Sequence, residues 1–400
     1  MNKKFTEIQL ILFLLLSATL FAQESSFNIG GYIKNLSSYQ RGNFAGFSSR
    51  AGHFQNTLQT RLNMTWYASP AFTIALQSRH LLVWQKNTKH SNSFFNLFST
   101  NHYYFNLNKK WINANDMQAT SEIDRIYLDW SWNNLEVTLG RQRIAWGTCL
   151  VWNPTDLFNP FHILDFDYEE KPGTDALHMQ YYLGSLSQLD FAITPGKASG
   201  DVIYAARFFF NYRKYDFNLI GGWQRNSLRL GGSWSGQLFD GGFRGEVVYS
   251  RPHITYFLPQ PPSFVLSPKH IKQPYWTIAL SYDYTFSNSF YWHTEYLYNE
   301  LGTTGNAAAR QFETLITGEL SPARHSLFQE FAYDLTPLWR TDLFIIFNPT
   351  DHSWIAGPSL QYSVSDNWTL YLLAFPSKGI KNSEFGTLPS WYFVRFKFSF

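Results

Sequence analysis

Polar and apolar residues alternate strictly along residues 54 to 66. One face carries Phe54, Leu58, Leu62, Met64 and Trp66 among its seven positions, whereas the intervening positions are all polar. A repeat of two residues is that of a β-strand with one apolar and one polar face. Because a strand of a two-sheet sandwich would give the same pattern, the class of fold depends on the rest of the chain.

The same alternation continues through the chain and predicts 18 strands. They are expected near 27 to 39, 53 to 67, 71 to 85, 121 to 132, 134 to 145, 175 to 184, 187 to 195, 202 to 212, 214 to 225, 227 to 237, 241 to 251, 274 to 286, 289 to 300, 326 to 335, 338 to 347, 353 to 363, 366 to 375 and 389 to 400. An even number is what a closed single-chain barrel requires.

Connection lengths test this count independently, because membrane barrels alternate short periplasmic turns with longer external loops. The alternate connections at 69–70, 133–134, 184–186, 213–214, 239–240, 287–288, 336–337 and 365 are all short. The other set contains the long connections 86–120, 146–174, 252–273, 301–325 and 376–388. Three members of that set, near 225, 196–201 and 348–352, are short as well, which leaves the strand count open by two.

The first 22 residues predict a secretory signal peptide. Lys3 and Lys4 precede an apolar run from Ile8 to Leu16, and small residues follow up to Ala22. That run is far shorter than the roughly 20 residues that a membrane-spanning helix needs. We therefore expect residues 1–22 to be removed and residues 23–400 to form one domain.

Composition indicates where that domain lies. Aromatic residues make up 19% of the chain and charged residues only 15%, against about 25% charged in a typical soluble domain. A secreted chain that alternates in this way and lacks surface charge is expected to be an all-β transmembrane antiparallel barrel in the outer membrane of a Gram-negative bacterium, in contact with its lipid. Trp66, Trp84 and Trp391 are among the residues expected at the two headgroup girdles.

Charge and cysteine content exclude other classes. Without Lys3, Lys4 and Glu7 the chain has about 30 basic and 28 acidic residues, so it has no basic stripe and nucleic acid is not an expected partner. Cys149 is the only cysteine, so that no disulfide can form within the chain.

The chain ends on an alternating strand, with Val394, Phe396, Phe398 and Phe400 on one face. A last strand that closes on a terminal Phe resembles the C-terminal signature by which outer-membrane barrels are recognised for assembly. This resemblance implies that the barrel-assembly machinery is a partner and that Phe400 carries the signal.

Residues 140 to 172 form the connection with the most distinctive chemistry. The Asn153-Pro154 and Asn159-Pro160 steps limit any helix between them to about one turn, so an ordered loop is predicted. Arg141 and Arg143 precede the loop, and four acids follow at Asp165, Asp167, Glu169 and Glu170. In the predicted topology this is the third external loop, which general porins fold into the barrel lumen.

The amino-acid sequence of this segment resembles that of a segment in one known group of barrels. Residues 140–147, Gly-Arg-Gln-Arg-Ile-Ala-Trp-Gly, followed by Asn-Pro at 153–154, are similar to the G-R-Q-x-x-x-W-G and N-P segment of porin-like, alginate-export-type barrels and their uncharacterised relatives. The likeness covers about 35 residues and implies passive passage of a small hydrophilic or polyanionic solute. It does not imply alginate itself, since that substrate needs a strongly basic lumen.

Strict alternation from Leu135 would point Arg141 and Arg143 at lipid, where arginine costs roughly 2–4 kcal/mol at the midplane. Either both side chains reach the outer rim, or a bulge at Gly140 turns them inward. We favour the bulge. Arg61, Arg79, Arg125, Tyr127 and Asp129 are expected to face the lumen as well.

These residues together predict a pore constriction with acids on the loop facing arginines on the wall, because charged rings are how pores select ions. The expected constriction residues are Arg125, Asp129, Arg141, Arg143, Trp146, Trp152, Asn153, Asp156, Asn159, Asp165, Asp167, Glu169 and Glu170. A solvated external loop, or a Ca²⁺ site on the four acids, are the alternatives.

No enzyme and no cofactor are expected. His80, His178, His293 and His325 stand singly on different predicted strands or loops, and neither Gly-x-Ser-x-Gly nor His-Glu-x-x-His occurs. The predicted function is therefore a channel for passive diffusion of small hydrophilic or anionic solutes, with sugars among the candidates. A closed barrel acting as adhesin, scaffold or hydrophobic-solute transporter is the alternative, and it would show large apolar residues facing inward.

Overall fold

The computed structural model of the chain describes residues 26–41, 52–86, 103–114, 116–159, 170, 172–197, 201–260, 265–271, 273–305, 307–386 and 388–400. For 86, 254–260, 265–271, 312–313 and 315–317 only the backbone is described. The predicted signal peptide lies outside these residues.

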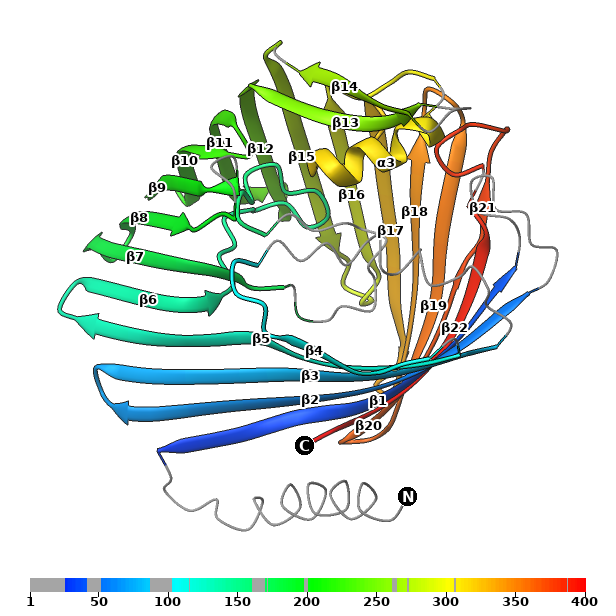
Figure 1. Cartoon of the computed structure of the whole chain (residues 1–400), viewed down its shortest axis with the longest axis horizontal. Helices are drawn as coiled ribbons and strands as arrows, with labels where there is room; N and C mark the ends of the chain where they lie inside the picture. The colour runs from blue at the N-terminus through cyan, green and yellow to red at the C-terminus, as the bar shows by residue number, and fades with distance from the viewer. Residues whose placement is uncertain are drawn as a thin grey trace.

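Antiparallel strands form a closed wall, shown in Figure 1. Each wall strand pairs with the next along the chain, and β22 pairs with β1 to close the ring. The sheet has 20 strands within the described residues, of which the short β4 (Asn108–Asn113) and β21 (Ser377–Lys378) only extend the long-loop rim, which leaves 18 for the barrel.

The wall strands are β1 (Phe27–Arg41), β2 (His53–Ser69), β3 (Phe72–Lys86), β5 (Met117–Trp132), β6 (Leu135–Gln142), β7 (Thr174–Gly184), β8 (Ser187–Thr194), β9 (Ile203–Tyr212), β10 (Tyr215–Gln224), β11 (Ser227–Leu238), β12 (Gly241–Pro252), β15 (Tyr275–Thr285), β16 (Tyr291–Asn299), β17 (His325–Thr336), β18 (Trp339–Asn348), β19 (Ser353–Ser365), β20 (Trp368–Phe375) and β22 (Ser390–Ser399).

All 18 predicted strands are confirmed, and their ends differ from the observed ones by at most four residues, at the start of β5. The tight turns follow from backbone geometry. Both residues of the Arg213-Lys214, Arg225-Asn226 and Phe239-Asp240 turns have positive φ, as the two-residue hairpin turns that match strand twist require.

Elements at the long-loop end were not predicted. They are β4, β21, the separate hairpin β13 (Ile254–Gln260) and β14 (Val265–Ile271), and helix α3 (Ala307–Thr317). The helix ends where Gly318 takes a φ of 71°, a left-handed conformation that glycine adopts without strain. No helix in the described part of the chain is long and apolar enough to cross a bilayer.

The two faces of the wall strands are as predicted. On β2, Leu58 is 39% exposed on the outer surface, whereas its neighbours Gln59 and Arg61 are buried in the interior. Leu139 and Phe396 are likewise exposed on the outside. An outward apolar belt around a polar interior is the arrangement of a transmembrane barrel.

The predicted girdle position of Trp391 is wrong. Trp66 and Trp84 are exposed on the outside, but Trp391 is only 6% exposed and packs in an interior cluster. It shares its face with the buried Phe393, since side chains two residues apart on a strand point the same way.

Candidate functional site

The connection between β6 and β7 folds into the barrel as far as residue 159, as predicted. Its apolar residues pack on the inner wall of β7 to β10, in a cluster of Ile144, Trp146, Leu157, Phe158, Ala176, Ala192, Ala205 and Ile220. Figure 1 shows this segment inside the ring of strands, between β6 and β12. We call residues 143–159 the constriction loop.

Glu246 on β12 holds the middle of the constriction loop. Its carboxylate accepts hydrogen bonds from the backbone amides of Thr148, Cys149 (2.8 Å) and Thr155 (2.9 Å), and from the Thr155 hydroxyl (2.6 Å). Glu246 itself is 0% exposed. A buried carboxylate is costly unless it is hydrogen-bonded in this way.

Glu295 on β16 holds the next stretch of the loop. It accepts hydrogen bonds from the amides of Leu150 (3.1 Å), Val151 (3.1 Å) and Trp152. These amides belong to neither helix nor strand, so the wall carboxylate supplies the acceptor that a buried backbone donor requires.

Apolar contacts fix the tip of the loop. The Trp152 ring meets Phe328 of β17 edge to face, with centroids 6.3 Å apart. Cys149 is 6% exposed, and its Sγ lies 3.9 Å from the Ala279 carbonyl of β15. Burial raises the pKa of the Cys149 thiol far above its ordinary value, and the carboxylates of Glu246 and Glu295 add to the rise.

Both asparagines of the Asn-Pro steps make turn contacts. The carbonyl of Asn153 accepts a hydrogen bond from the Asp156 amide at 3.1 Å, which closes the single predicted turn. Asn159 accepts one from the Ile144 amide and donates one to the Pro172 carbonyl at 2.8 Å. Asn159 therefore joins the two ends of the constriction loop.

The favoured bulge at Gly140 is wrong, although Arg141 is buried and does not reach lipid. Pairing with both neighbouring strands is continuous through Gly140, which instead has a φ of 122°. Arg141 is 1% exposed and donates to both oxygens of Asp175 (2.8 and 3.1 Å), with its guanidinium over the Tyr103 ring. Arg143 lies just beyond β6 and is exposed.

Glu170 reaches an arginine of the wall, as predicted for the acids that follow the loop. Its carboxylate lies 3.5 Å from Arg61 Nη1 and accepts a hydrogen bond from the Tyr32 hydroxyl at 3.0 Å. Arg61 is also paired with Asp124 at 2.7 Å. Asp165, Asp167 and Glu169 lie outside the described residues, and with them most of the alternative Ca²⁺ site.

Sequence reasoning missed Asp124. The pairing of β3 with β5 shifts register between Gln77 and Ser78 and leaves Asp124 as an extra residue. This bulge brings Asp124, 0% exposed, into the interior. Alternation alone could not have found it, because the bulge breaks the period. Arg125 pairs with the interior Gln77 in register, and Asp129 accepts a hydrogen bond from Thr138 at 2.6 Å.

Interior bases gather on one part of the wall, which we call the basic arc. Strands β22, β1, β2 and β3 contain no Asp or Glu. The inward bases of these strands are Lys34, Arg61, Arg79, Arg395 and Lys397. Lys34 and Lys397 pair directly in register, and both ammonium groups lie over the Tyr32 ring, at 5.6 and 4.7 Å.

Interior acids gather on another part, the acidic arc of β12 and β15 to β18. Its inward acids are Glu246, Asp283, Glu295, Glu330 and Asp342. Asp283 pairs with Arg244. The described wall is electrostatically polarised between these two arcs, and paired acids and arginines such as Asp190 and Arg207 lie on the strands outside them.

Large apolar residues also face inward, which the sequence reasoning did not predict. Beside Cys149 and Trp152, the cluster contains Ala279, Leu297, Phe328, Ile346, Ile355, Leu373, Phe375, Phe385, Trp391 and Phe393. Conversely Phe208 shares the outward face with Leu219, its pairing partner, which is 57% exposed. The apolar cluster fills part of the lumen along β15 to β22.

His293 does not stand alone, so that expectation is wrong. Its Nε2 lies 3.0 Å from the Ser281 hydroxyl and its Nδ1 lies 3.2 Å from Glu330. The order Ser, His, Glu is that of a hydrolase triad. However, Ser281 is 2% and His293 0% exposed, and Glu295 also contacts Nε2 at 3.4 Å, so a substrate carbonyl has no approach to the hydroxyl.

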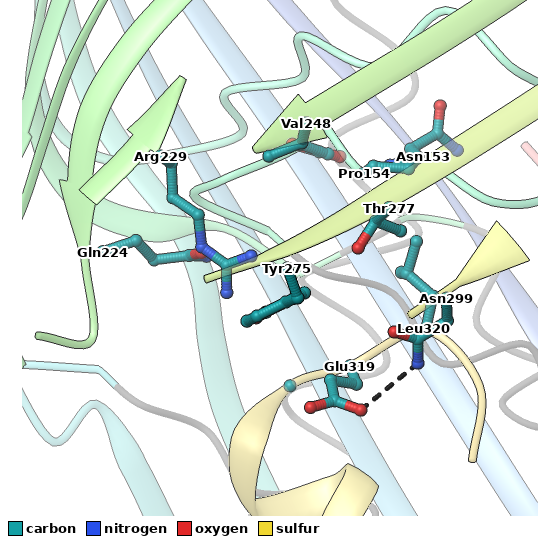
Figure 2. A pocket seen from close by; sticks show the side chains of 12 residues that line it. Asn153, Pro154, Gln224, Arg229, Val248, Tyr275, Thr277, Asn299, Glu319 and Leu320 are labelled. Carbon is teal, nitrogen blue, oxygen red and sulfur yellow. Dashed lines mark hydrogen bonds between the residues drawn. The ribbon is translucent and has the colours of Figure 1, made fainter. Parts of the chain in front are cut away.

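A small cavity of about 30 Å³ lies between the constriction loop, the wall and the end of α3 (Figure 2). It is lined by Asn153, Pro154, Asp156, Gln224, Arg229, Val248, Tyr275, Thr277, Asn299, Gly318, Glu319 and Leu320. Its volume has room for about a water molecule or two. It is therefore too small to be the pore.

The long-loop end is tied together around Glu384. Its carboxylate accepts hydrogen bonds from Asn348 (2.9 Å) and Ser321 (3.3 Å), and its amide donates to Asp351 (2.7 Å). Burial raises the pKa of Glu384 to about 8; Asp351 adds to the rise, and the hydrogen bonds from Asn348 and Ser321 oppose it. Three connections, 300–324, 349–352 and 376–389, thus meet at one acid.

A closed antiparallel barrel with an external loop held against its inner wall is the architecture of a porin-type channel. Solved structures share this fold. OccAB4 of Acinetobacter baumannii aligns with a TM-score of 0.55 at 10% identity, covering 93% of this chain and 98% of that one. OpdK of Pseudomonas aeruginosa, solved with vanillate, gives 0.54 at 9% with the same coverage, and OccK5 (OpdH) of the same organism gives 0.53 at 8%.

At these identities the likeness is one of fold. No family model matches the chain, and no curated protein matches it either. The comparisons do not bear on the resemblance to alginate-export-type barrels, which stays a prediction.

Proposed function

We propose that this chain is an outer-membrane channel through which small hydrophilic solutes diffuse passively. The observation that carries the proposal is the constriction loop, which is held across part of the lumen by buried wall carboxylates. A wide barrel needs such a narrowing to select among solutes.

Exposure of inward groups supports a water-filled lumen. The side chains of Arg207, Arg244 and Glu330 point inward from three strands and are 17%, 22% and 26% exposed. Charged groups retain such exposure only where water reaches them.

The polarised wall favours anionic solutes on one side of the pathway. The basic arc has cations on four adjacent strands. Arg61 and Arg79 pair with Asp124 and Glu122 of β5, whereas Lys34, Arg395 and Lys397 lie on two paired strands that contain no acid. Fixed charges that line a pore concentrate counter-ions and exclude ions of like charge. Small carboxylates and other compact anions are therefore the solutes to test first, with neutral sugars as the comparison.

We place the mature protein, residues 23–400, in the outer membrane after removal of the signal peptide. The outward apolar belt supports contact with lipid. Phe400 closes the ring with β1, since Gly31 and Phe400 exchange two backbone hydrogen bonds of 2.9 and 3.0 Å. We propose that this terminal strand is the part read by the barrel-assembly machinery.

The inward apolar cluster is the observation in favour of a closed barrel or a path for hydrophobic solutes. It occupies the wall from β15 to β22, whereas the inward charges of β1 to β9 lie elsewhere. A hydrophilic pathway along β1 to β9 is compatible with both observations.

Purified protein in planar bilayers distinguishes the two functions. We expect discrete, salt-dependent conductance steps, partly blocked by small carboxylates added on one side. Proteoliposomes should swell in isotonic solutions of these solutes. A protein that is folded and inserted but conducts no ion and admits no solute would instead support the closed barrel.

A further inference from the structure

We propose that Glu246 and Glu295 are the positioning residues that set the width of the pore, by binding the backbone of the constriction loop. The proposal rests on the channel function proposed above, because it concerns the residues that hold its narrowing. We call the two side chains the carboxylate clasps.

The clasps bind main chain, not side chains. Together they accept hydrogen bonds from six backbone amides, those of Thr148, Cys149, Leu150, Val151, Trp152 and Thr155. Hydrogen bonds to an ionised acceptor are roughly twice as strong as neutral ones. The clasps thus hold the main chain of the loop, in addition to the contacts that its side chains make.

Other inward acids are engaged differently. Asp124, Asp175 and Asp190 each pair with an arginine of the wall. Glu246 instead binds loop amides, and Glu295 does so with His293 as a second neighbour. This difference separates acids that stabilise the wall from acids that hold the loop.

The wall between the clasps is shaped to receive the loop. Glu246 of β12 pairs in register with Ala279 of β15, and β15 pairs with β16, which carries Glu295. Ala279 is 0% exposed and lies beneath Cys149. A larger side chain at position 279 would occupy the space that the Cys149 thiol fills. Ala279, the two clasps and the constriction loop therefore pack together as one unit.

Cys149 provides a readout that does not depend on conduction. It is the only cysteine of the chain, and it is buried between the clasps. A water-soluble maleimide should label it slowly while the loop is held, and rapidly once the loop is released.

The experiment compares Glu246→Ala, Glu295→Ala and the double alanine variant with the wild-type protein. We expect maleimide labelling of the folded barrel to be at least tenfold faster in the double variant. Open-channel current should become noisier and the mean conductance larger. Asp283→Asn is the matched control, because it removes an inward carboxylate of the same wall that pairs with Arg244 and not with the loop.

Glu246→Gln and Glu295→Gln keep the shape and one acceptor oxygen, and serve if the alanine variants do not fold. They should label at rates between wild type and alanine. The proposal is overturned if folded variants keep slow labelling and quiet wild-type conductance, or if only ion selectivity changes, which a purely electrostatic role would produce. A wild-type protein that conducts nothing contradicts the channel function alone, since the labelling comparison still tests the clasps.

Discussion

Gly140, directly before Arg141, has a backbone conformation that glycine adopts without strain. Its φ of 122° lies in a region that other residues avoid, and a Cβ there would approach the Ile126 carbonyl oxygen to 2.3 Å. The glycine therefore allows this conformation while pairing continues on both sides, and Arg141 meets Asp175 as its register partner on β7.

Replacing Gly140 with alanine should destabilise the barrel by about 1–3 kcal/mol, because both backbone strain and the close contact must be accommodated. Urea unfolding in detergent, followed by tryptophan fluorescence, measures the change. Gly221→Ala is the control, since a Cβ there meets only the Leu230 side chain at 3.5 Å. Equal stability of the two variants would contradict this account.

Glu384 should make the stability of the connections that meet at it, at the long-loop end, depend on pH. Its folded-state pKa of about 8 lies above the ordinary value of 4.5. Stability from the protonated acid is therefore fully present below about pH 4.5 and is lost as the pH rises through about 8, because the unfolded chain releases the proton first.

Hydrogen exchange of residues 376–386, corrected for intrinsic rates, should be faster at pH 9 than at pH 6. Glu384→Gln should remove most of this difference, because the amide carries no charge at either pH. Asp334→Asn, at an exposed ion pair with Arg340, should retain it. A pH difference that persists unchanged in Glu384→Gln would assign the effect to another group.

At the scale of elements, the connection between β6 and β7 combines a wall-bound segment with an acidic one. Residues 143–159 lie against the clasps, whereas Glu170 lies near Arg61 of the basic arc. The connection thus brings charge from one side of the lumen to the other.

Replacing Asp165, Asp167, Glu169 and Glu170 with Asn or Gln should lower cation preference, because negative charge is removed from the pathway and Arg61 loses a partner. Reversal potentials in a salt gradient measure the shift, and heat-modifiable migration in gels reports the folded wall. Glu300→Gln, at an external loop and bound to the Trp276 amide, is the control. If selectivity and conductance both stay at wild-type values, the acids play no part in the constriction.

At the scale of the whole molecule, the ring depends on its last strand. β22 pairs with β1 and β20, and the terminal Phe400 extends the pairing to Gly31. A closed ring leaves no edge strand, which is what allows the sheet to lie in lipid.

Deletion of Phe400 should reduce the amount of folded barrel in the outer membrane several-fold, because it removes both closing hydrogen bonds and the terminal aromatic ring. Phe400→Tyr retains both and should assemble normally. The heat-modifiable band in outer-membrane fractions measures the outcome. Normal assembly of the deletion would show that neither the bonds nor the signal is needed.

The sequence by itself determined the strand pattern and the inside and outside of each strand. Alternation is a local property, because successive side chains of a strand must point to opposite faces, so Leu58 and Arg61 could be assigned before any contact was known. The even count and the alternating connection lengths then led to the closed ring. The Asn-Pro steps also marked the ordered loop.

Tertiary structure alone decided what the inward residues meet. The bulge at Asp124 breaks the period of two residues. The positive φ of Gly140 is a conformation that a glycine in the sequence permits but does not require. Glu246 was readable as inward, but its partners are backbone amides about 90 residues away, whose identity no local pattern encodes. The inward cluster of Phe328, Phe375 and Trp391 likewise forms because strands distant in sequence converge on the loop and fill the lumen there.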